Sequence, residues 1–303
     1  MAYTTGGLIQ ASDYNGFATS LNTILSTGTG NSGYGQTTVS SVAAAGTVTA
    51  TQWSTLVGAV NKVRSHQATF SNLGLYTSGT TINATTDVQT NINTAITNKL
   101  NHASNGVTIT GSAFTLTVAS AETTAAVTAS VEKTATFGSS DQARYFFNAG
   151  GEIRYFLVSY TNTGGTVRGS TLGGLAENGL GGKTFSGETA SARYGSLYTV
   201  TTDATTTAGY FDLTTGYVDQ VKISGSLYGA AYSGDFARIQ TKYSGATTNG
   251  AKGNIFHFNL TLSSSAQSPA FNDSINVTVN CRIDVTPPSA TYLTDSWGTV
   301  TIA

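Results

Sequence analysis

The stretch Asn254–Leu262 reads Asn-Ile-Phe-His-Phe-Asn-Leu-Thr-Leu and decides the fold class of this chain. From Phe256 onward, bulky apolar residues alternate with polar ones, and His257, Asn259 and Thr261 occupy the polar positions. Such alternation indicates a strand with one buried and one wet side, which is typical of antiparallel sheets. We therefore expect an antiparallel sheet whose wet face carries His257.

Similar runs follow one another through the second half of the chain, separated by turns such as Asn148–Gly151 and by the three prolines. The predicted strands cover residues 144–147, 152–160, 197–201, 210–214, 220–227, 236–243, 254–262, 276–285 and 297–302. Many short strands favour an antiparallel β-sandwich of about eight strands over residues 137–303. The glycine-rich residues 172–188 are expected to form a long loop.

Residues 106–136 lie between this region and the N-terminal third of the chain. The period of two begins at Gly106 and predicts a hairpin over residues 106–118, with its turn at 110–112. The remainder has few bulky apolar residues, so we interpret 106–136 as a β linker. The expected fold is α+β, mainly β, with a small helical module over residues 1–105 before the sandwich.

The first 105 residues carry apolar side chains at helical spacing. One helix is predicted to start at Ser12 and a second at Thr49, where Thr49 and Gln52 have the spacing of a capping box. A shift of 39 positions superimposes the first pattern on the second, which indicates an internal repeat. A third helix is predicted to start at Thr86. The predicted assembly interface consists of the apolar residues of these helices: Tyr14, Phe17, Leu21, Trp53, Leu56, Val60, Val88, Ile92, Ile96 and Leu100.

The spacing alone does not decide whether these side chains pack within the chain or against another subunit. The distribution of charge favours association, because only five of the first 120 residues are charged. An exposed module with so few charges would be poorly soluble. We therefore expect a homo-oligomer in which the helical module is buried against neighbouring subunits.

Composition excludes several functional classes. The 303 residues include 14 basic and 15 acidic side chains, for a net charge of −1, and no basic cluster that nucleic acid would require. No run approaches the roughly 20 apolar residues of a membrane span, and residues 1–10 do not resemble a signal peptide. The single cysteine, Cys281, cannot form an intrachain disulfide. Neither nucleic acid nor membrane insertion is expected.

No motif in the sequence indicates catalysis or metal binding. His66, His102 and His257 have no Cys, His or Asp neighbours at ligand spacing. Gly179–Thr184 ends like a phosphate-binding loop, but Glu177 occupies the position of its first glycine. We therefore predict no catalytic residue, no metal site and no cofactor.

A ligand surface could be built from tyrosines, because a tyrosine ring offers an apolar face and a polar tip to a sugar. Tyr228 and Tyr232 lie among Gly and Ser residues and are the candidate glycan contacts, with core packing as the ordinary alternative. A polysaccharide hydrolase would need two carboxylates facing each other in a groove. The sequence does not pair any of the candidate carboxylates, which are Glu177, Glu188, Asp203, Asp212 and Asp219.

Five segments of the chain resemble a known family. They are Ile9–Asn15, Tyr34–Gln36 and Ala50–Trp53 in the helical module, and Ala143–Arg154 and Gly209–Thr215 in the β region. Together they resemble the virion structural proteins of tailed bacteriophages, of the cyanophage type, over about two-thirds of the chain. The resemblance implies a structural role in the particle and carries over no enzymatic residue.

We therefore expect a non-enzymatic, homo-oligomeric structural protein of a tailed-phage virion, forming a fibre or spike attached to the tail or neck. The expected partners are copies of itself and other tail, neck or capsid proteins. The expected location is the virion, after synthesis without a signal peptide in the host cytoplasm. Two alternatives remain open, namely an adhesin domain that binds host surface glycan and a capsid decoration protein. A hydrolase ranks last.

Overall fold

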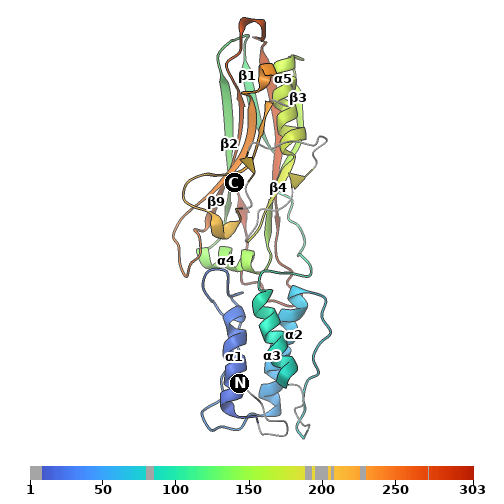
Figure 1. The fold of residues 1–303 in the computed structure, drawn as a ribbon, viewed down its shortest axis with the longest axis vertical. Helices are drawn as coiled ribbons and strands as arrows, with labels where there is room; N and C mark the ends of the chain where they lie inside the picture. The colour runs from blue at the N-terminus through green and yellow to red at the C-terminus, as the bar shows by residue number, and fades with distance from the viewer. Residues whose placement is uncertain are drawn as a thin grey trace.

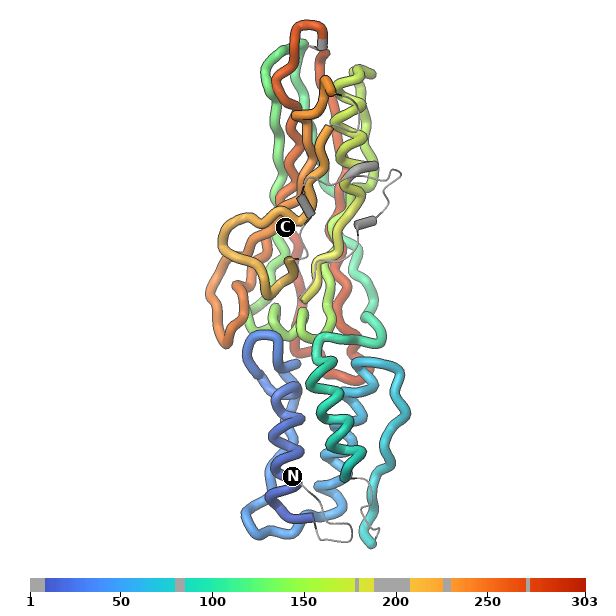
Figure 2. Tube along the Cα trace, in the orientation of Figure 1, coloured from blue at the N-terminus to red at the C-terminus, as the bar shows by residue number. Residues whose placement is uncertain are grey.

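A computed structural model describes residues 9–79, 85–187, 193–194, 204–205, 208–225, 230–271 and 273–303. The molecule is elongated, with three helices at one end and two packed sheets extending away from them (Figure 1, Figure 2). This architecture confirms the predicted α+β class with N-terminal helices and antiparallel sheets. Helix and strand fractions are similar, so the fold is less dominated by strands than expected.

The helical module consists of α1 (Ala11–Leu25), α2 (Ala50–Gln67) and α3 (Thr85–Thr97). α2 begins at the predicted capping box, in which the Gln52 N–H donates to Thr49 Oγ1 at 3.2 Å and the Thr49 N–H donates to Gln52 Oε1 at 2.8 Å. The predicted start of α1 is wrong by two residues, because Gln10 is the N-cap and Ser12 lies inside the helix. Thr86 likewise lies inside α3.

The two copies of the internal repeat make equivalent contacts. In α1, Asn22 holds the backbone of Val39 with two hydrogen bonds of 2.8 and 2.9 Å. In α2, Asn61 holds the backbone of Leu73 in the same way, with both bonds at 2.9 Å. The 39-residue shift superimposes Asn22 on Asn61, so the repeat has a structural role in both copies.

A second pair of positions extends this equivalence. Asn15 hydrogen-bonds the carbonyl and the N–H of Val42, both at 2.8 Å, and Ser54 hydrogen-bonds those of Tyr76 at 2.6 and 2.9 Å. In each copy the segment that follows the helix runs antiparallel to it, so its first contact lies nearer the C-terminal end of the helix and its second contact nearer the N-terminal end. We call these returning segments, residues 39–42 and 73–76, the straps. Each repeat unit is therefore a helix with a strap fastened along it.

Two antiparallel sheets form the β-sandwich. The five-stranded sheet has the order β1 (Phe114–Ser120), β10 (Ile275–Thr286), β3 (Glu152–Asn162), β4 (Gly182–Phe185) and β5 (Arg193–Tyr194). The six-stranded sheet has the order β11 (Thr301–Ile302), β2 (Val127–Thr136), β9 (Ile255–Ser264), β8 (Phe236–Ser244), β7 (Val218–Ser224) and β6 (Ala204–Thr205). The strand predicted over 297–302 is therefore confined to its last residues, and the one predicted over 197–201 lies outside the described residues.

Residues 106–136 are not a linker, because they supply a strand to each sheet. β1 pairs with β10 over its whole length, and β2 pairs with β9 from Val127↔Ser264 to Thr136↔Ile255. The predicted local hairpin is also absent, since Ile109 forms a bridge with Val285, far along the chain. Partners this distant in sequence cannot be identified from the local alternation that suggested the hairpin.

Two predicted strands are helical. Residues 144–147 belong to α4 (Ser140–Asn148), where the Ser139 hydroxyl accepts a hydrogen bond from the Gln142 N–H at 3.1 Å. The aromatic run that suggested a strand is buried by packing on both sheets, so tertiary contacts override its β propensity. Residues 210–212 form the short 3₁₀ helix η2 (Tyr210–Asp212) instead of a strand.

The glycine-rich segment predicted to be a long loop over residues 172–188 forms regular elements over its described part, residues 172–187. α5 (Val167–Gly174) covers β3 and β10, and the π-helix η1 (Leu175–Leu180) contacts β3 of one sheet and β8 of the other. Leu172, Leu175 and Leu180 are fully buried. These apolar side chains bring the segment into the core between the sheets. The high glycine content had suggested an exposed loop instead.

Candidate functional site

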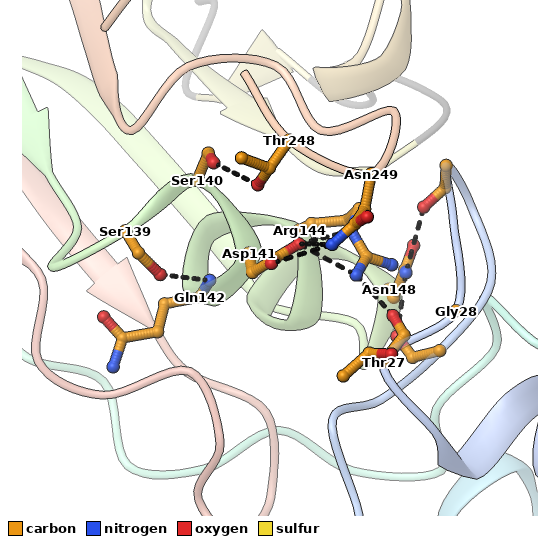
Figure 3. A network of polar contacts seen from close by, with 12 residues as sticks. Thr27, Gly28, Ser139, Ser140, Asp141, Gln142, Arg144, Asn148, Thr248 and Asn249 are labelled. Atoms are coloured by element: carbon orange, nitrogen blue, oxygen red, sulfur yellow. Dashed lines mark hydrogen bonds and ion pairs between the residues drawn. The ribbon is translucent and has the colours of Figure 1, made fainter. Parts of the chain in front are cut away.

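A network of polar contacts between segments far apart in sequence joins the helical module to the sandwich. It is formed by the loop of residues 27–36, which follows α1, and by α4, which closes the adjoining end of the sheets (Figure 3). We call this contact the junction. It is the candidate functional site because two of the segments that resemble phage virion proteins meet there.

Arg144 of α4 is the centre of the junction. Its side chain is completely buried, and it donates hydrogen bonds to the Thr27 carbonyl and, at 2.6 Å, to the Ser32 carbonyl. It also forms an ion pair with Asp141 at 3.0 Å, and Asp141 accepts a hydrogen bond from Asn249 at 3.1 Å (Figure 3). A buried guanidinium needs such partners, because leaving a charge unpaired out of water is very costly.

Asn148, one turn further along α4, holds the same loop. Its side-chain amide donates to the Gly33 carbonyl at 2.9 Å and to the Gly30 carbonyl at 3.3 Å. The Gly30 N–H in turn donates to the Asn249 carbonyl at 2.9 Å. The β8–β9 loop therefore contacts both partners, and the loop of residues 27–36 is fixed from two sides.

The Tyr34-Gly35-Gln36 motif supplies the other side of the junction. Tyr34 is fully buried, and its hydroxyl donates to the Lys99 carbonyl at 2.5 Å while accepting from Gln67 at 3.2 Å. Burial raises the pKa of Tyr34, so the hydroxyl stays protonated. Gly35 has a φ of +65° and lies so close to Tyr145 that an added Cβ would be 2.6 Å from the ring. A glycine is required on both counts.

Gln36 connects the motif to the C-terminal segment. Its side-chain amide donates to the Thr294 carbonyl at 2.8 Å, and its oxygen accepts from the Thr294 N–H at 2.7 Å. The three motif residues thus hold the end of α2, the turn that follows α3, α4 and the chain near residue 294 in one place. The motif therefore stabilises a joint.

His66 adds a titratable contact at the end of α2. Its Nε2 lies 3.1 Å from the Ala149 carbonyl, which can only accept, so this nitrogen carries the proton. Burial lowers the pKa of His66 to about 4, and the ring is therefore neutral at pH 7. His66 is only 2% exposed, so it is a core histidine at the junction.

The residues predicted to contact other subunits are mostly covered by the chain itself. Eight of them are at most 1% exposed, namely Tyr14, Phe17, Leu21, Trp53, Leu56, Val60, Val88 and Ile92. The Trp53 ring meets the Phe17 ring edge-on at 5.8 Å, which is a contact between the two repeat copies. Ile96 is 36% exposed and Leu100 is half-buried. The stripes form an intrachain core, because three helices can cover one another's apolar faces without a partner.

The candidate glycan contacts do not form a surface in the described residues. Tyr232 is only 6% exposed, so its ring cannot stack on a sugar, and this prediction is wrong for Tyr232. Tyr228 lies outside the described residues. Among the described residues, no group of three or more His, Cys, Asp or Glu side chains could hold a metal ion.

A second polar arrangement lies on the wet face of the six-stranded sheet, where the sequence placed His257. His257 Nδ1 is 2.7 Å from Glu132 Oε1, and its Nε2 is 2.8 Å from Ser244 Oγ. Because an ionised carboxylate only accepts, Nδ1 carries a proton, and in the neutral ring Nε2 then accepts from the serine hydroxyl. This connectivity is that of a serine–histidine–carboxylate relay. The sequence gave no signal for it, because the strand register brings the three residues together.

Comparison with known proteins returns no relative: no family model, no curated protein and no solved structure matches the chain. The similarity to phage virion proteins therefore stays a prediction carried by the quoted segments. None of the helices in the described part of the chain combines the length and apolar character that crossing a bilayer requires.

Proposed function

We propose that this chain is a non-enzymatic, homo-oligomeric structural protein of a tailed-phage virion, forming an elongated fibre or spike unit at the tail or neck. The observation that carries the proposal is the junction. The Tyr34–Gln36 and Ala143–Arg154 segments, which resemble the phage proteins, pack on each other although more than 100 residues separate them. Segments with one shared structural role support a common architecture more strongly than isolated matches would.

The arrangement of the molecule suits that role. The helical module and the sheets lie at opposite ends of an elongated body, and buried hydrogen bonds join them (Figure 1). In the proposed particle the helical end attaches to other virion proteins and the sheets project outward. Contacts with neighbouring subunits would use side chains outside the intrachain helical core.

Labelling of purified particles tests this proposal. Antibodies raised against the full-length chain should decorate the tail or neck in negative-stain micrographs, and the chain should be found in washed particles by mass spectrometry. Decoration over the whole head would instead favour a capsid decoration protein. Absence from washed particles, with the chain abundant in the infected-cell lysate, would reject a virion role. The host-glycan adhesin alternative loses Tyr232 as a contact.

The Ser244–His257–Glu132 relay favours a second candidate function, hydrolysis of an ester. The Ser244 oxygen would attack the ester carbonyl carbon while its proton passes to His257 Nε2. That proton would leave with the alcohol as the ester C–O bond breaks, and water would then hydrolyse the acyl-serine by the same route. Glu132 would hold the imidazole in the required tautomer.

A fluorophosphonate probe, which reacts with activated serines, separates the two candidates. Covalent labelling of the full-length chain that is lost in Ser244→Ala and retained in Ser263→Ala, a serine on the same wet face, would establish an activated serine. Unlabelled protein, or labelling equal in both variants, would reject the hydrolase and leave the relay as a structural hydrogen-bond chain.

A further inference from the structure

The wet face of the six-stranded sheet concentrates positive charge in a chain that has little charge of either sign. Lys222 of β7 and Arg238 of β8 are directly opposite each other in the strand register, and Lys242 lies four residues further along β8. Each is partly exposed. We call these three residues the cationic strip.

The cationic strip has no anionic partner in the described part of the chain, where no carboxylate oxygen lies within 4.0 Å of its charged nitrogens. Among the described residues of the same face, the two acidic ones are already bonded elsewhere. Asp219 accepts a hydrogen bond from Gln240 at 2.6 Å, and Glu132 is 2.7 Å from His257. Within the described residues, Arg238 Nε is also buried without a hydrogen-bond partner. Within the described residues, the cationic strip therefore has an unbonded hydrogen-bond donor and positive charge that no carboxylate neutralises.

The positions of Lys222 and Arg238 in the sheet destabilise the fold. Like charges directly opposite each other in an antiparallel pair are destabilising, yet Lys222 faces Arg238. Both side chains also lie over the same ring, with Lys222 Nζ 5.0 Å and the Arg238 guanidinium 5.2 Å from the centre of Phe236. The ring supports the two cations through cation–π attraction, but it does not neutralise them. An anion held between them would remove the repulsion.

We infer that the cationic strip binds an anionic polysaccharide. Two features of the face favour a polysaccharide over a small anion. The strip runs along β8, so Arg238 and Lys242 are separated by roughly 13 Å at the usual rise per residue. The neighbouring position Asn259 on β9 is partly exposed and carries a short polar side chain that suits sugar hydroxyl groups.

The spacing of charge favours a polysaccharide over nucleic acid. A nucleic acid strand carries a phosphate about every 3.4 Å, far more densely than the strip carries cations. Acidic sugars that alternate with neutral ones match a sparse row of cations better. The strip also lies away from Tyr228 and Tyr232, so it is a different site from the tyrosine surface expected from the sequence.

Affinity electrophoresis of the full-length chain tests this inference. Gels containing hyaluronate, in which acidic and neutral sugars alternate, should retard the protein at low salt, gels containing neutral dextran should not, and 0.5 M NaCl should abolish the effect because the contacts are ionic. Lys222→Gln combined with Arg238→Gln should weaken the retardation at least tenfold. Lys62→Gln, which removes one charge from the exposed face of α2, is the matched control for the single variant Lys222→Gln and should retain the retardation.

Folding of the variants is checked independently by thermal unfolding. Removing one of two like charges should leave the midpoint unchanged or raise it, so the single variant Lys222→Gln keeps the test valid if the double variant fails to fold. Absence of retardation, an equal loss in Lys62→Gln and in Lys222→Gln, or tighter binding to single-stranded DNA than to hyaluronate would each overturn the inference. None of these outcomes depends on where the chain lies in a virion, so this test and particle labelling can fail separately.

Discussion

At the scale of single residues, Arg144 has the largest expected effect on stability. Replacing it with Met removes a fully buried charge and leaves the Thr27 and Ser32 carbonyls without their donor. We expect Arg144→Met to lower the free energy of unfolding by about 3 kcal/mol, because unmade buried hydrogen bonds cost more than made ones gain. Urea denaturation measures this. Arg64→Met, which loses hydrogen bonds of 3.3 and 3.4 Å and a cation–π contact with Phe70 on a partly exposed side chain, should cost less, about 1 kcal/mol.

Gly35 allows a comparison of backbone conformation with steric contact. Gly35 and Gly165 have similar positive φ angles, +65° and +62°, but only Gly35 faces a ring, and nothing lies within 4 Å of an added Cβ at Gly165. Gly165→Ala should therefore cost only the conformational penalty of about 1 kcal/mol. Gly35→Ala should cost clearly more, and its urea midpoint should be the lower of the two. Equal midpoints would show that Tyr145 moves aside freely.

His66 predicts a pH dependence of stability. Its pKa is lowered from 6.5 to about 4 in the folded chain, so the unfolded chain binds a proton more readily between these values. Stability should be full above pH 6.5 and should fall as the pH drops toward 4, by about 3 kcal/mol in total. Urea midpoints measured from pH 4 to 7 check this. His66→Gln should flatten the profile, whereas His257→Gln should leave the steep part in place.

At the scale of elements, sequence patterns succeeded where an element's own residues record its surroundings. The alternation in Asn254–Leu262 reflects one dry and one wet side, and β9 has both. Sequence patterns failed where the structure of a segment depends on residues far away along the chain. The sequence predicted a linker in place of β1 and β2, because their partners β10 and β9 lie more than 100 residues away along the chain. It predicted a strand in place of α4, because the tertiary contacts of the aromatic run are not visible in the sequence. The junction was hidden for the same reason, since Arg144 bonds carbonyls more than 110 residues earlier.

The straps give a prediction at the element scale. Asn22 and Asn61 make equivalent pairs of hydrogen bonds, so Asn22→Ala and Asn61→Ala should each lower the free energy of unfolding by about 1–2 kcal/mol. Asn93→Ala, on the exposed side of α3, is the control and should be nearly neutral. A loss confined to one repeat copy would mean that the two straps are not equivalent in energy.

At the scale of the whole molecule, the junction should make the helical module and the sandwich unfold together. Arg144 and Asn148 together bond four carbonyls of the loop of residues 27–36, and the buried His66 and Tyr34 add contacts beside them. Shared buried contacts of this kind make one part costly to unfold while the other stays folded. Calorimetry of the full-length chain should therefore show a single transition whose calorimetric and van't Hoff enthalpies agree.

Breaking the junction should separate the two unfolding events. In Arg144→Met combined with Asn148→Ala, the helical module loses its polar attachment while each part keeps its own apolar core, so two calorimetric transitions should appear. Asn280→Ala combined with Lys62→Gln changes residues outside the junction and should retain one transition. Two transitions in the unmodified chain would contradict a rigid joint. They would also weaken the proposed fibre, because a unit that transmits force along its length needs its two ends to be firmly connected.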